Sequence, residues 1–486
     1  MKREKNTLSP EQKSALRLMH SGKNIFLTGK AGTGKSTILR RFQEECNHEC
    51  VFLAPTGIAA NNIEGATIHS FFQFKPVLLT SDSIEEISSR RRINMIREVK
   101  TIVIDEVSMV RSDLFNAIDM RLKKITHSSR PFGGKQIILV GDFFQLAPVV
   151  KSEPELDYLK RELGGIYAFQ TKLWQQANFQ NIYLQEIHRQ KDDETFMAIL
   201  NDLRNGELTE RNLELDSLDE PVNAIEALTH LCVGRPVLKK EAIYLCTTNR
   251  EADTRNQAKL NEIRKEVHVF RAVVQGKFPR TDYPTPEMLS LKIGARVMTL
   301  TNKRTPDGDI EYVNGDLGYI EAFEDCDEPT VRVHLDRGST VSIQRAEWNK
   351  YEYVLETDAK TGKAVIRQHE IGTFVQMPLK LAYAITIHKS QGLSLDFVEV
   401  KLGNGCFATG QLYTALSRCR SIKNLRIDRK VHSEDAITDQ AVIDFYRSIE
   451  PDPDPQPEQK KDMRSIPEKI KEAVSALLAR FYGNKI

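Results

Sequence analysis

The clearest chemical signal of the chain is a glycine-rich stretch near the N-terminus. It reads Gly29-Lys30-Ala31-Gly32-Thr33-Gly34-Lys35-Ser36 and matches the pattern G-x-x-x-x-G-K-[ST] at every fixed position. The glycines let backbone N–H groups converge on a phosphate, and the start of a following helix adds partial positive charge. Lys35 can reach the β- and γ-phosphates, and the Ser36 hydroxyl can hold Mg²⁺. This stretch predicts a nucleoside triphosphate site with contacts from Gly29, Ala31, Gly32, Thr33, Gly34, Lys35, Ser36 and Thr37.

Two adjacent carboxylates provide the second signal. Asp105 and Glu106 directly follow the apolar segment 101–104. Asp105 can hold Mg²⁺, usually through water, and Glu106 can accept a proton from an attacking water molecule. Two acids at the end of a strand are common by themselves, but beside a phosphate-binding loop they predict hydrolysis of the nucleotide.

Phosphoryl transfer also needs positive charge against the γ-phosphate. Arg189 follows a predicted strand and Arg418 follows a predicted helical turn, and an arginine finger is worth roughly 10³–10⁵ in rate. A surface salt bridge is the commoner role for any single arginine, so only a position across a domain cleft favours these two. Gln145, just past the segment 136–140, is a candidate sensor of the γ-phosphate.

The elements that must position these residues alternate between strands and helices. The predicted strands are nearly continuous apolar runs, which is typical of parallel strands covered on both faces. Ser9 and Gln12 form a capping-box pattern at the start of a helix over 7–20, and Ser112 is a predicted N-cap. The pattern predicts one α/β domain over 1–183, with strands at 25–28, 50–53, 101–104, 136–140 and 181–184 and helices near 35–46, 56–63 and 111–124.

The second half of the chain predicts another α/β domain with a β insertion. Asp192 or Asp193 can cap a helix that ends near Gly206. Further candidates are strands at 242–247 and 295–300 and a helix at 249–264. Asn-Gly, Asp-Gly and Arg-Gly turns between short alternating segments indicate a small antiparallel unit. The predicted parts are a second domain at 184–304 and 377–450, an insert at 305–376, a linker at 451–465 and an amphipathic helix at 466–486, which would dock on this chain or on a partner.

Composition sets weaker limits. The formal net charge of +2 is compatible with a basic nucleic-acid groove offset by acidic faces. The chain has no run of eighteen apolar residues, and residues 1–6 carry no targeting pattern, so we expect no membrane span and a cytoplasmic or nucleoid location. Cys46 and Cys50 flank His48 without further metal ligands nearby, which predicts free thiols in a reducing compartment.

Taken together, these residues resemble the Pif family of superfamily 1B DNA helicases, which are related to the RecD helicases. The resemblance covers about residues 7–430, with the motifs in the order of the family. Gln12 would read the adenine edge, although the capping box is a rival use of its side chain. The matching segments are the Q motif at 7–12, motif Ia at 54–60, a DNA-contacting motif at 67–72, motif II at 104–109, motif III at 141–148, the family signature at 184–204 with Arg189, motif V at 384–392 and motif VI at 413–418 with Arg418.

The resemblance implies two RecA-like domains with ATP and Mg²⁺ in their cleft and single-stranded DNA across their top. It also implies an SH3-like insert, which matches the β unit at 305–376, and a small wedge near 61–85. Members of the family unwind DNA with 5′-to-3′ polarity and often act on forks, G-quadruplexes and RNA–DNA hybrids. The implied contacts are Gly392 for the nucleotide and Thr56, Gly57, His69, Ser70, His388 and Lys389 for the nucleic acid.

Two functions remain open on the sequence. One is an ATP-driven DNA helicase, expected to be a monomer, and the other is an ATP-gated single-stranded DNA-binding or remodelling protein that does not separate strands. The intact carboxylate pair and the arginine candidates favour turnover. An RNA helicase is a third option, since single-strand grooves mainly read phosphates and base faces. A GTPase is disfavoured because 302–305 lacks the aspartate of the guanine-specifying pattern. Phe71, Phe72, Phe143 and Phe144 could stack on bases, but core packing is favoured for most of them.

Overall fold

The computed structural model describes residues 8–450 of the 486-residue chain apart from short gaps. Arg189, the predicted linker 451–465 and the predicted helix 466–486 lie outside the described residues. The gaps are 47–48, 82–83, 85, 187–192, 211–220, 235–241, 306–309, 326–327 and 358–363.

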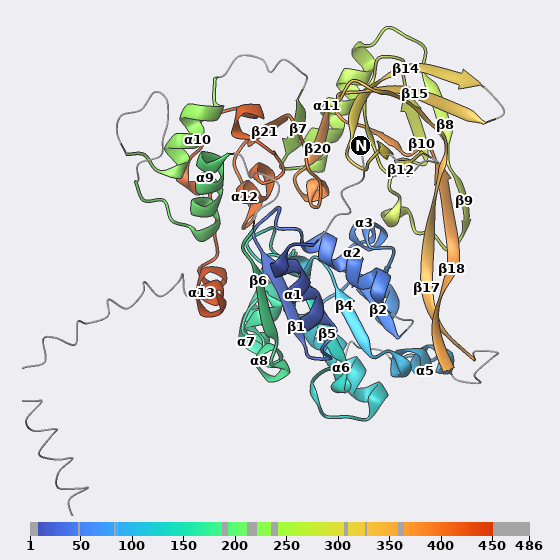
Figure 1. The fold of residues 1–486 in the computed structure, drawn as a ribbon, viewed down its shortest axis with the longest axis vertical. Coiled ribbons are helices and arrows are strands. Elements are labelled where there is room, and N and C mark those ends of the chain that lie inside the picture. The colour runs from blue at the N-terminus through green and yellow to red at the C-terminus, as the bar shows by residue number, and fades with distance from the viewer. Residues whose placement is uncertain are drawn as a thin grey trace, which may run out of the picture. The chain divides into compact units, whose positions relative to one another are not determined.

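The first α/β domain is built on a parallel sheet of six strands (Figure 1). Its order is β3-β2-β4-β5-β1-β6, and all of its strand pairs are parallel. The five strands predicted from the sequence are all present, with ends that agree within one residue. Their bounds are β1 (Ile25–Gly29), β2 (Cys50–Ala54), β3 (Ala66–Thr67), β4 (Thr101–Ile104), β5 (Gln136–Val140) and β6 (Gln180–Leu184).

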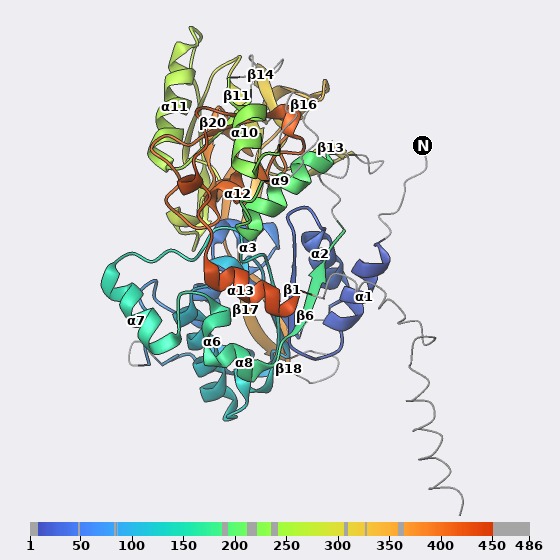
Figure 2. The same ribbon diagram turned by 90° about the vertical axis from the view of Figure 1, so that its left-hand side faces the viewer.

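Both faces of this sheet are covered. Ile25 and Leu27 of β1 lie in a core cluster with residues of α1 (Pro10–Met19) and α2 (Lys35–Glu45). Phe26 points to the opposite face, where its ring centroid lies 5.3 Å from that of Trp174 in α8 (Lys172–Ala177). Figure 2 shows α1 and α2 on one side of the sheet and α6 and α8 on the other. The remaining helices are α3 (Gly57–Asn62), α4 (Ile68–Phe72), α5 (Arg90–Glu98), α6 (Ser112–Thr126) and α7 (Glu153–Leu163).

The helix starts agree with the sequence in one case and differ in another. The capping box of Ser9 and Gln12 is confirmed at the start of α1. The predicted N-cap Ser112 is wrong, because Arg111 is the N-cap and Ser112 is the first helical residue. The Ser112 hydroxyl donates instead to the Gly165 carbonyl at 2.6 Å, so a tertiary contact takes the atom that would have capped the helix.

The second α/β domain contains a parallel sheet in the order β20-β7-β21-β22. Asp193 caps α9 (Glu194–Asn205) and Gly206 ends it, as predicted. The Asn256 side chain of α11 (Asn249–Glu262) bonds both backbone polar groups of Ala384, which fixes the helix on β20. The other elements are β7 (Ile243–Cys246), β20 (Ala384–Thr386), β21 (Val398–Lys401), β22 (Leu425–Ile427), α10 (Ala224–Cys232), α12 (Gln411–Leu416) and α13 (Gln440–Ile449).

The inserted β unit is larger than the predicted span 305–376. Its five-stranded antiparallel sheet has the order β16-β15-β14-β11-β19. The strand predicted at 295–300 as part of the second α/β set is β11 of this sheet, because Val297 packs in the core of the insert. The strands are β8 (His268–Arg271), β9 (Val273–Gly276), β10 (Met288–Leu291), β11 (Arg296–Thr299), β12 (Lys303–Arg304), β13 (Ile310–Tyr312), β14 (Leu317–Asp325), β15 (Pro329–Leu335), β16 (Thr340–Ile343), β17 (Ala346–Thr357), β18 (Ala364–Gln376) and β19 (Leu379–Leu381).

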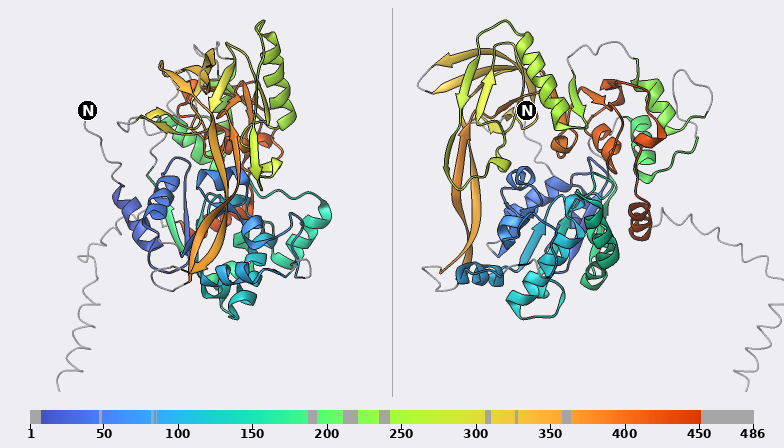
Figure 3. Two further views of the ribbon diagram at one scale, coloured as in Figure 1. Left: turned by 90° about the vertical axis from the view of Figure 1, so that its right-hand side faces the viewer. Right: turned by 180° about the vertical axis from the view of Figure 1, so that it is seen from behind.

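Strands β17 and β18 form a long hairpin that contacts α5 of the first domain (Figure 3).

No helix within the described residues is both long enough and apolar enough to cross a membrane. The structure also pairs Cys46 with Cys50, where the sequence predicted free thiols; their Cα atoms lie 6.4 Å apart.

Candidate active site

The phosphate-binding loop lies between β1 and α2, at the carboxyl edge of the first sheet. Gly29 leaves β1 where a side chain cannot fit, since a Cβ there would lie 2.5 Å from the Leu184 carbonyl oxygen. The Lys35 ammonium donates to the carbonyl oxygens of Gly29 and Lys30 at 2.7 and 3.0 Å. These carbonyls hold the lysine over the loop, and the phosphate oxygens of a nucleotide can replace them.

Gln12 contacts both helix α1 and the loop. Its Oε1 accepts from the Ser9 backbone N–H at 3.1 Å, and its Nε2 lies 3.5 Å from the Thr33 carbonyl oxygen. The capping box therefore leaves one end of the amide directed at the nucleotide site. The predicted contact of Gln12 with adenine stays a prediction.

The two carboxylates crowd a buried site. Burial is the main cause that raises the pKa of Asp105, to about 7, and Glu106 raises it further. The pKa of Glu106 is also raised by burial, whereas Arg418 and Lys35 oppose the shift. Two buried acids side by side favour either a shared proton or a nearby cation. A base whose pKa lies above that of a free carboxylate is better matched to accepting a proton near neutral pH.

The donor set fits Mg²⁺. Ser36 and Asp105 line one pocket, and the crowded carboxylates provide the negative charge that a divalent cation would neutralise. Within the described residues, no group of three or more His, Cys, Asp or Glu side chains forms a metal cluster. Mg²⁺ keeps several waters and uses one or two protein ligands plus substrate phosphates, a role that Ser36 and Asp105 can fill. The ion would supply positive charge to the β- and γ-phosphate oxygens.

The pocket has a volume of about 780 Å³ and is lined by both α/β domains. Most of the predicted nucleotide residues line it, and Arg418 and Gly392 reach it from the second domain. Gly29 and Thr33 lie in the loop without lining the pocket. The predicted residues in its lining are Gln12, Ala31, Gly32, Gly34, Lys35, Ser36, Thr37, Asp105, Glu106, Gln145, Gly392 and Arg418.

Arg418 is held by its own helical turn. Its Nε donates to the Thr414 carbonyl and its Nη2 to the Ser417 hydroxyl, both at 3.0 Å. The side chain is 2% exposed. Burial lowers the pKa of Arg418, while the negative charge of Glu106 acts against that shift, so the guanidinium lies in the field of the predicted general base. This arrangement places a preorganised cation opposite the phosphate-binding loop.

Sequence reasoning assigned no role to three residues that join the two domains at this pocket. The Tyr413 phenol accepts from the Ala31 N–H at 3.2 Å and donates to Asp142 at 3.3 Å, a pairing across 271 positions of sequence. Arg204 of α9 forms an ion pair with Asp142 at 3.4 Å and stacks over the Phe144 ring. Tyr413 and Arg204 fall inside recognised segments, but nothing local indicates their partners.

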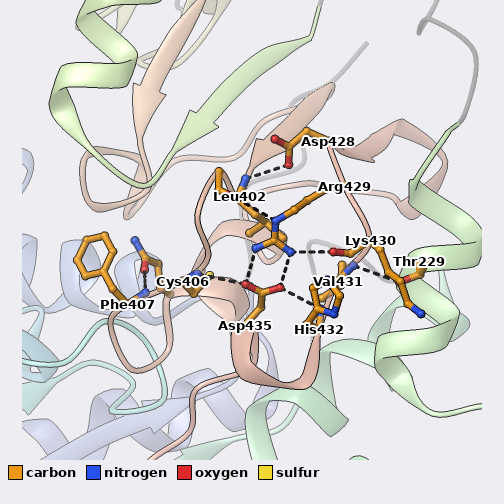
Figure 4. Close-up of polar contacts among 12 residues, drawn as sticks. Thr229, Leu402, Cys406, Phe407, Asp428, Arg429, Lys430, Val431, His432 and Asp435 are labelled. Atoms are coloured by element: carbon orange, nitrogen blue, oxygen red, sulfur yellow. Dashed lines mark hydrogen bonds and ion pairs between the residues drawn. The ribbon is translucent and has the colours of Figure 1, made fainter.

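A polar cluster braces the loop 402–410, which leads into α12 and Arg418 (Figure 4). Arg429 makes two bonds to the Asp435 carboxylate, each of 2.8 Å, and Asp435 accepts from the Cys406 N–H at 3.2 Å. At the end of the loop Gly410 packs on the first domain, where a Cβ would lie 2.3 Å from the Phe144 carbonyl oxygen. The cluster therefore fixes α12, which directly precedes the turn with Arg418, against the segment after β5.

The predicted nucleic-acid residues fall into two groups. Thr56 caps α3, and His69 and Ser70 lie on α4, so these follow β2 and β3 of the first sheet. His388 and Lys389 follow β20 in the second domain, and the Lys389 side chain is exposed. Gly57 is covered, since a Cβ there would lie 2.7 Å from the Asp282 carboxylate. The four phenylalanines considered for base stacking, Phe71, Phe72, Phe143 and Phe144, are buried in the core.

Lys380 of β19 is a further cation that the sequence did not single out. Burial lowers its pKa to about 8, and the positive charge of Lys389 contributes to the shift. Lys380 therefore lies within electrostatic reach of Lys389, one of the predicted nucleic-acid residues.

The fold and site define a class before any comparison. Two α/β domains, each with a parallel sheet, share one pocket. The phosphate-binding loop and the carboxylate pair lie on one side of it, and a buried arginine lies on the other. This is the arrangement of a P-loop nucleotide hydrolase with two RecA-like domains, as the sequence predicted.

Comparisons with known proteins show the family. Residues 7–214 match the family described as PIF1-like helicase. The chain is 34% identical over 451 residues to ATP-dependent DNA helicase Pif1 from Bdellovibrio bacteriovorus, covering 91% of this chain and 92% of that protein. It is 33% identical to ATP-dependent DNA helicase PIF1 from Danio rerio over 91% of this chain, but spans only 64% of that longer relative. The chain belongs to the PIF1-like helicase family.

Solved structures agree with this assignment. The crystal structure of Bacteroides sp. Pif1 in complex with ADP-AlF4 covers 91% of this chain and 97% of its own, with 33% identity and a TM-score of 0.78. The structure of Bacteroides Pif1 bound to ssDNA has the same coverage, 34% identity and a TM-score of 0.62. The fold described above is therefore nearer to the first arrangement than to the DNA-bound one.

Proposed function

We propose that this protein is an ATP-dependent DNA helicase that translocates 5′ to 3′ on single-stranded DNA and unwinds duplexes from a junction. The observation that carries the proposal is the shared pocket, in which Lys35 and Glu106 of the first domain face Arg418 of the second. A site divided between two domains couples their separation to the state of the nucleotide.

The chemistry follows from this geometry. Glu106 accepts a proton as water attacks the γ-phosphate of ATP, and its raised pKa suits that task. Lys35 and Arg418 stabilise the charge that develops on the transferred phosphoryl oxygens. Bound ATP attracts both cations and favours closure of the pocket. Loss of the γ-phosphate removes that attraction, so the domains reopen.

The nucleic-acid side rests on the two groups of polar residues. Thr56, His69 and Ser70 on the first domain and His388 and Lys389 on the second would hold phosphates on either side of the domain boundary. If the two grips alternate, each cycle of closure moves the strand. The Bacteroides relative bound to ssDNA supports DNA as the substrate, and the polarity rests on membership of the family.

Finer features of this function are also proposals. We propose forks, G-quadruplexes and RNA–DNA hybrids as further substrates, because a groove that reads phosphates and base faces tolerates them. A monomer suffices, since both halves of the nucleotide pocket lie on one chain. The cytoplasm, at the nucleoid, is the proposed location because it holds the DNA substrate.

The test is strand separation on duplexes with a 5′ or a 3′ single-stranded tail, measured beside DNA-stimulated ATP hydrolysis. Unwinding from the 5′ tail alone supports the proposal. Stimulated hydrolysis without unwinding of either substrate would favour an ATP-gated DNA-binding or remodelling protein instead. Unwinding from the 3′ tail would contradict the polarity and leave the nucleotide site intact.

A further inference from the structure

A second hollow lies on the first domain, next to the predicted DNA residues Thr56 and His69. Its volume is about 210 Å³, and it shares no lining residue with the nucleotide pocket. Pockets that take drug-sized ligands measure roughly 300–1,000 Å³. This hollow therefore suits a smaller group, of the size of a single aromatic base.

The walls of the hollow are fixed by one ionic hub. Arg111 bonds both carboxylate oxygens of Asp113, at 2.7 and 2.8 Å, and it also bonds Glu155 at 3.1 Å. Asp113 accepts from the Leu79 N–H at 2.8 Å, and Glu155 accepts from the Lys151 N–H at 3.0 Å. The hub therefore ties three wall segments, around 76–79, 109–114 and 149–155, into one preformed shape.

Apolar side chains form part of the lining. Val77 is 51% exposed and Val149 is 62% exposed, and both lie at the same hollow. Exposed apolar side chains are ordinary when scattered singly, but two of them at one concave site indicate a ligand with apolar faces. Leu79, Met109 and Leu114 add further apolar lining.

Polar groups also line the hollow, and Thr56 and His69 are two of them besides the hub. The Thr56 hydroxyl accepts from the Ala59 N–H, which leaves its own proton to donate. Burial is the main cause that lowers the pKa of His69, so the ring is neutral at pH 7 and has one donor and one acceptor nitrogen. No hydrogen bond joins this ring to a residue in the described part of the chain. The hollow therefore combines apolar side chains with polar groups, among them the charged residues of the hub. A nucleobase likewise has flat apolar faces and a polar edge.

We propose that this hollow binds one unstacked nucleobase of the single strand. The proposal rests on the proposed function and names a subsite of its DNA-binding surface. Thr56 and His69 lie where a strand gripped by the first domain would pass, so the flanking phosphates stay outside while one base enters. The base lies between Val77 and Val149, with its edge toward His69. Contact with base faces makes the subsite tolerant of sequence.

The experiment uses the full chain with ADP and aluminium fluoride on a duplex with a short 5′ single-stranded tail, which fixes the register. One 2-aminopurine is moved along a thymidine tail, and an abasic residue is moved along a second series. Wild-type protein is expected to enhance fluorescence at one tail position only, because the base there loses its stacking neighbours. An abasic residue at that position should weaken binding about tenfold.

The variant Val149→Trp fills the hollow from its exposed rim. It should abolish the enhancement and make the abasic and intact tails bind equally, near the weaker affinity. Met120→Trp is the matched control, since Met120 is an exposed residue of α6 outside the lining. The melting temperature of each variant reports its folding, and His69→Asn offers a second, smaller change at the polar edge.

The outcomes separate this inference from the proposed function. Tight binding of the tail without any position-dependent signal would overturn the subsite alone. Weaker binding of Val149→Trp to every tail, with the abasic difference retained, would also overturn it, because the tryptophan would then obstruct the backbone. Absence of single-strand binding by the wild type would remove the proposed function, and the subsite with it.

Discussion

Each of the two α/β domains contains a strand–turn–helix unit, but the two domains use it differently. In the first domain five residues, 30–34, separate β1 from α2, and they form the phosphate-binding loop. In the second domain only Thr247 and Thr248 separate β7 from α11, and the Thr248 side chain caps the helix at the Glu251 N–H. A capped helix start has used an N–H group that a phosphate would need.

The two domains share an architecture but contribute different parts of the nucleotide site. The first domain can bind the triphosphate and the metal ion, while the second can only complete the pocket from outside. It does so with Arg418, which follows α12, and with Tyr413, which reaches the loop itself. Function therefore depends on residues grafted on the fold, and the shared architecture alone would not reveal which domain binds nucleotide.

The largest expected effect comes from breaking the loop of the first domain. Lys35→Ala should abolish ATP hydrolysis, a loss at least as large as the roughly 10³–10⁵ ascribed to an arginine finger. The Lys35 ammonium lies over the loop, where it can reach the β- and γ-phosphates. Steady-state hydrolysis with single-stranded DNA measures it, with Lys23→Ala, an exposed residue before β1, as the control. Turnover that survives in Lys35→Ala would contradict the nucleotide site.

Removing the arginine that the second domain contributes should lower ATP hydrolysis slightly less than removing Lys35 does. Arg418→Ala should lower turnover by roughly 10³-fold while single-strand binding changes little, because Arg418 faces Glu106 and the nucleotide pocket. Arg418→Lys should not restore the rate, since a lysine cannot reproduce the planar guanidinium. Hydrolysis and DNA affinity are measured on the same preparations. An equal loss of both would make Arg418 a structural residue.

A third change tests the bridge between the domains. Tyr413→Phe removes the hydroxyl that bonds Ala31 and Asp142, and hydrolysis should fall about tenfold. Burial raises the pKa of Tyr413, so the phenol stays protonated and this bond should not depend on pH near neutrality. A double-mutant cycle with Asp142→Asn measures the coupling. Full additivity of the two changes would mean that the bond carries none of the effect.

The smallest effect concerns the DNA surface and its pH dependence. Lys380, with a pKa of about 8, loses its proton as the pH rises from 7 to 9. Phosphates favour its protonated form, so binding takes up a proton and affinity should fall about two- to fivefold over this range. Titration of fluorescent single-stranded DNA at each pH measures it. Lys380→Gln should remove this dependence of DNA affinity on pH, whereas Lys13→Gln on α1 should keep it. An unchanged pH dependence in Lys380→Gln would exclude Lys380 as its source.

Much of this protein could be predicted from contiguous sequence. The loop at 29–36 and the carboxylates after 101–104 are local patterns, because one turn and one strand end create each of them. The strands of the first sheet were also recognisable, since parallel strands buried on both faces are nearly uninterrupted apolar runs. The capping box of Ser9 and Gln12 is local for the same reason.

Other features depend on contacts with residues far away in the sequence, which no local pattern predicts. Ser112 was predicted to cap a helix, but its hydroxyl donates to the Gly165 carbonyl. The strand β11 was predicted to belong to the second α/β set, but it pairs with β14 in the insert. The sequence offered the capping box and the adenine as rival uses of Gln12, and only the geometry shows that its two amide ends face different groups, Ser9 and the Thr33 carbonyl.

The sequence by itself determined the chemistry of the nucleotide: a loop for phosphates, a carboxylate pair for metal and proton, and the family that uses them. Only the tertiary structure decided which distant residues complete the site and where a base can enter. Asp142 meets Tyr413 and Arg204, and the Arg111 hub shapes the hollow at Val149, because packing joins segments that are far apart along the chain. Contiguous motifs record local backbone geometry, whereas long-range ion pairs and hollows arise only when whole elements pack together.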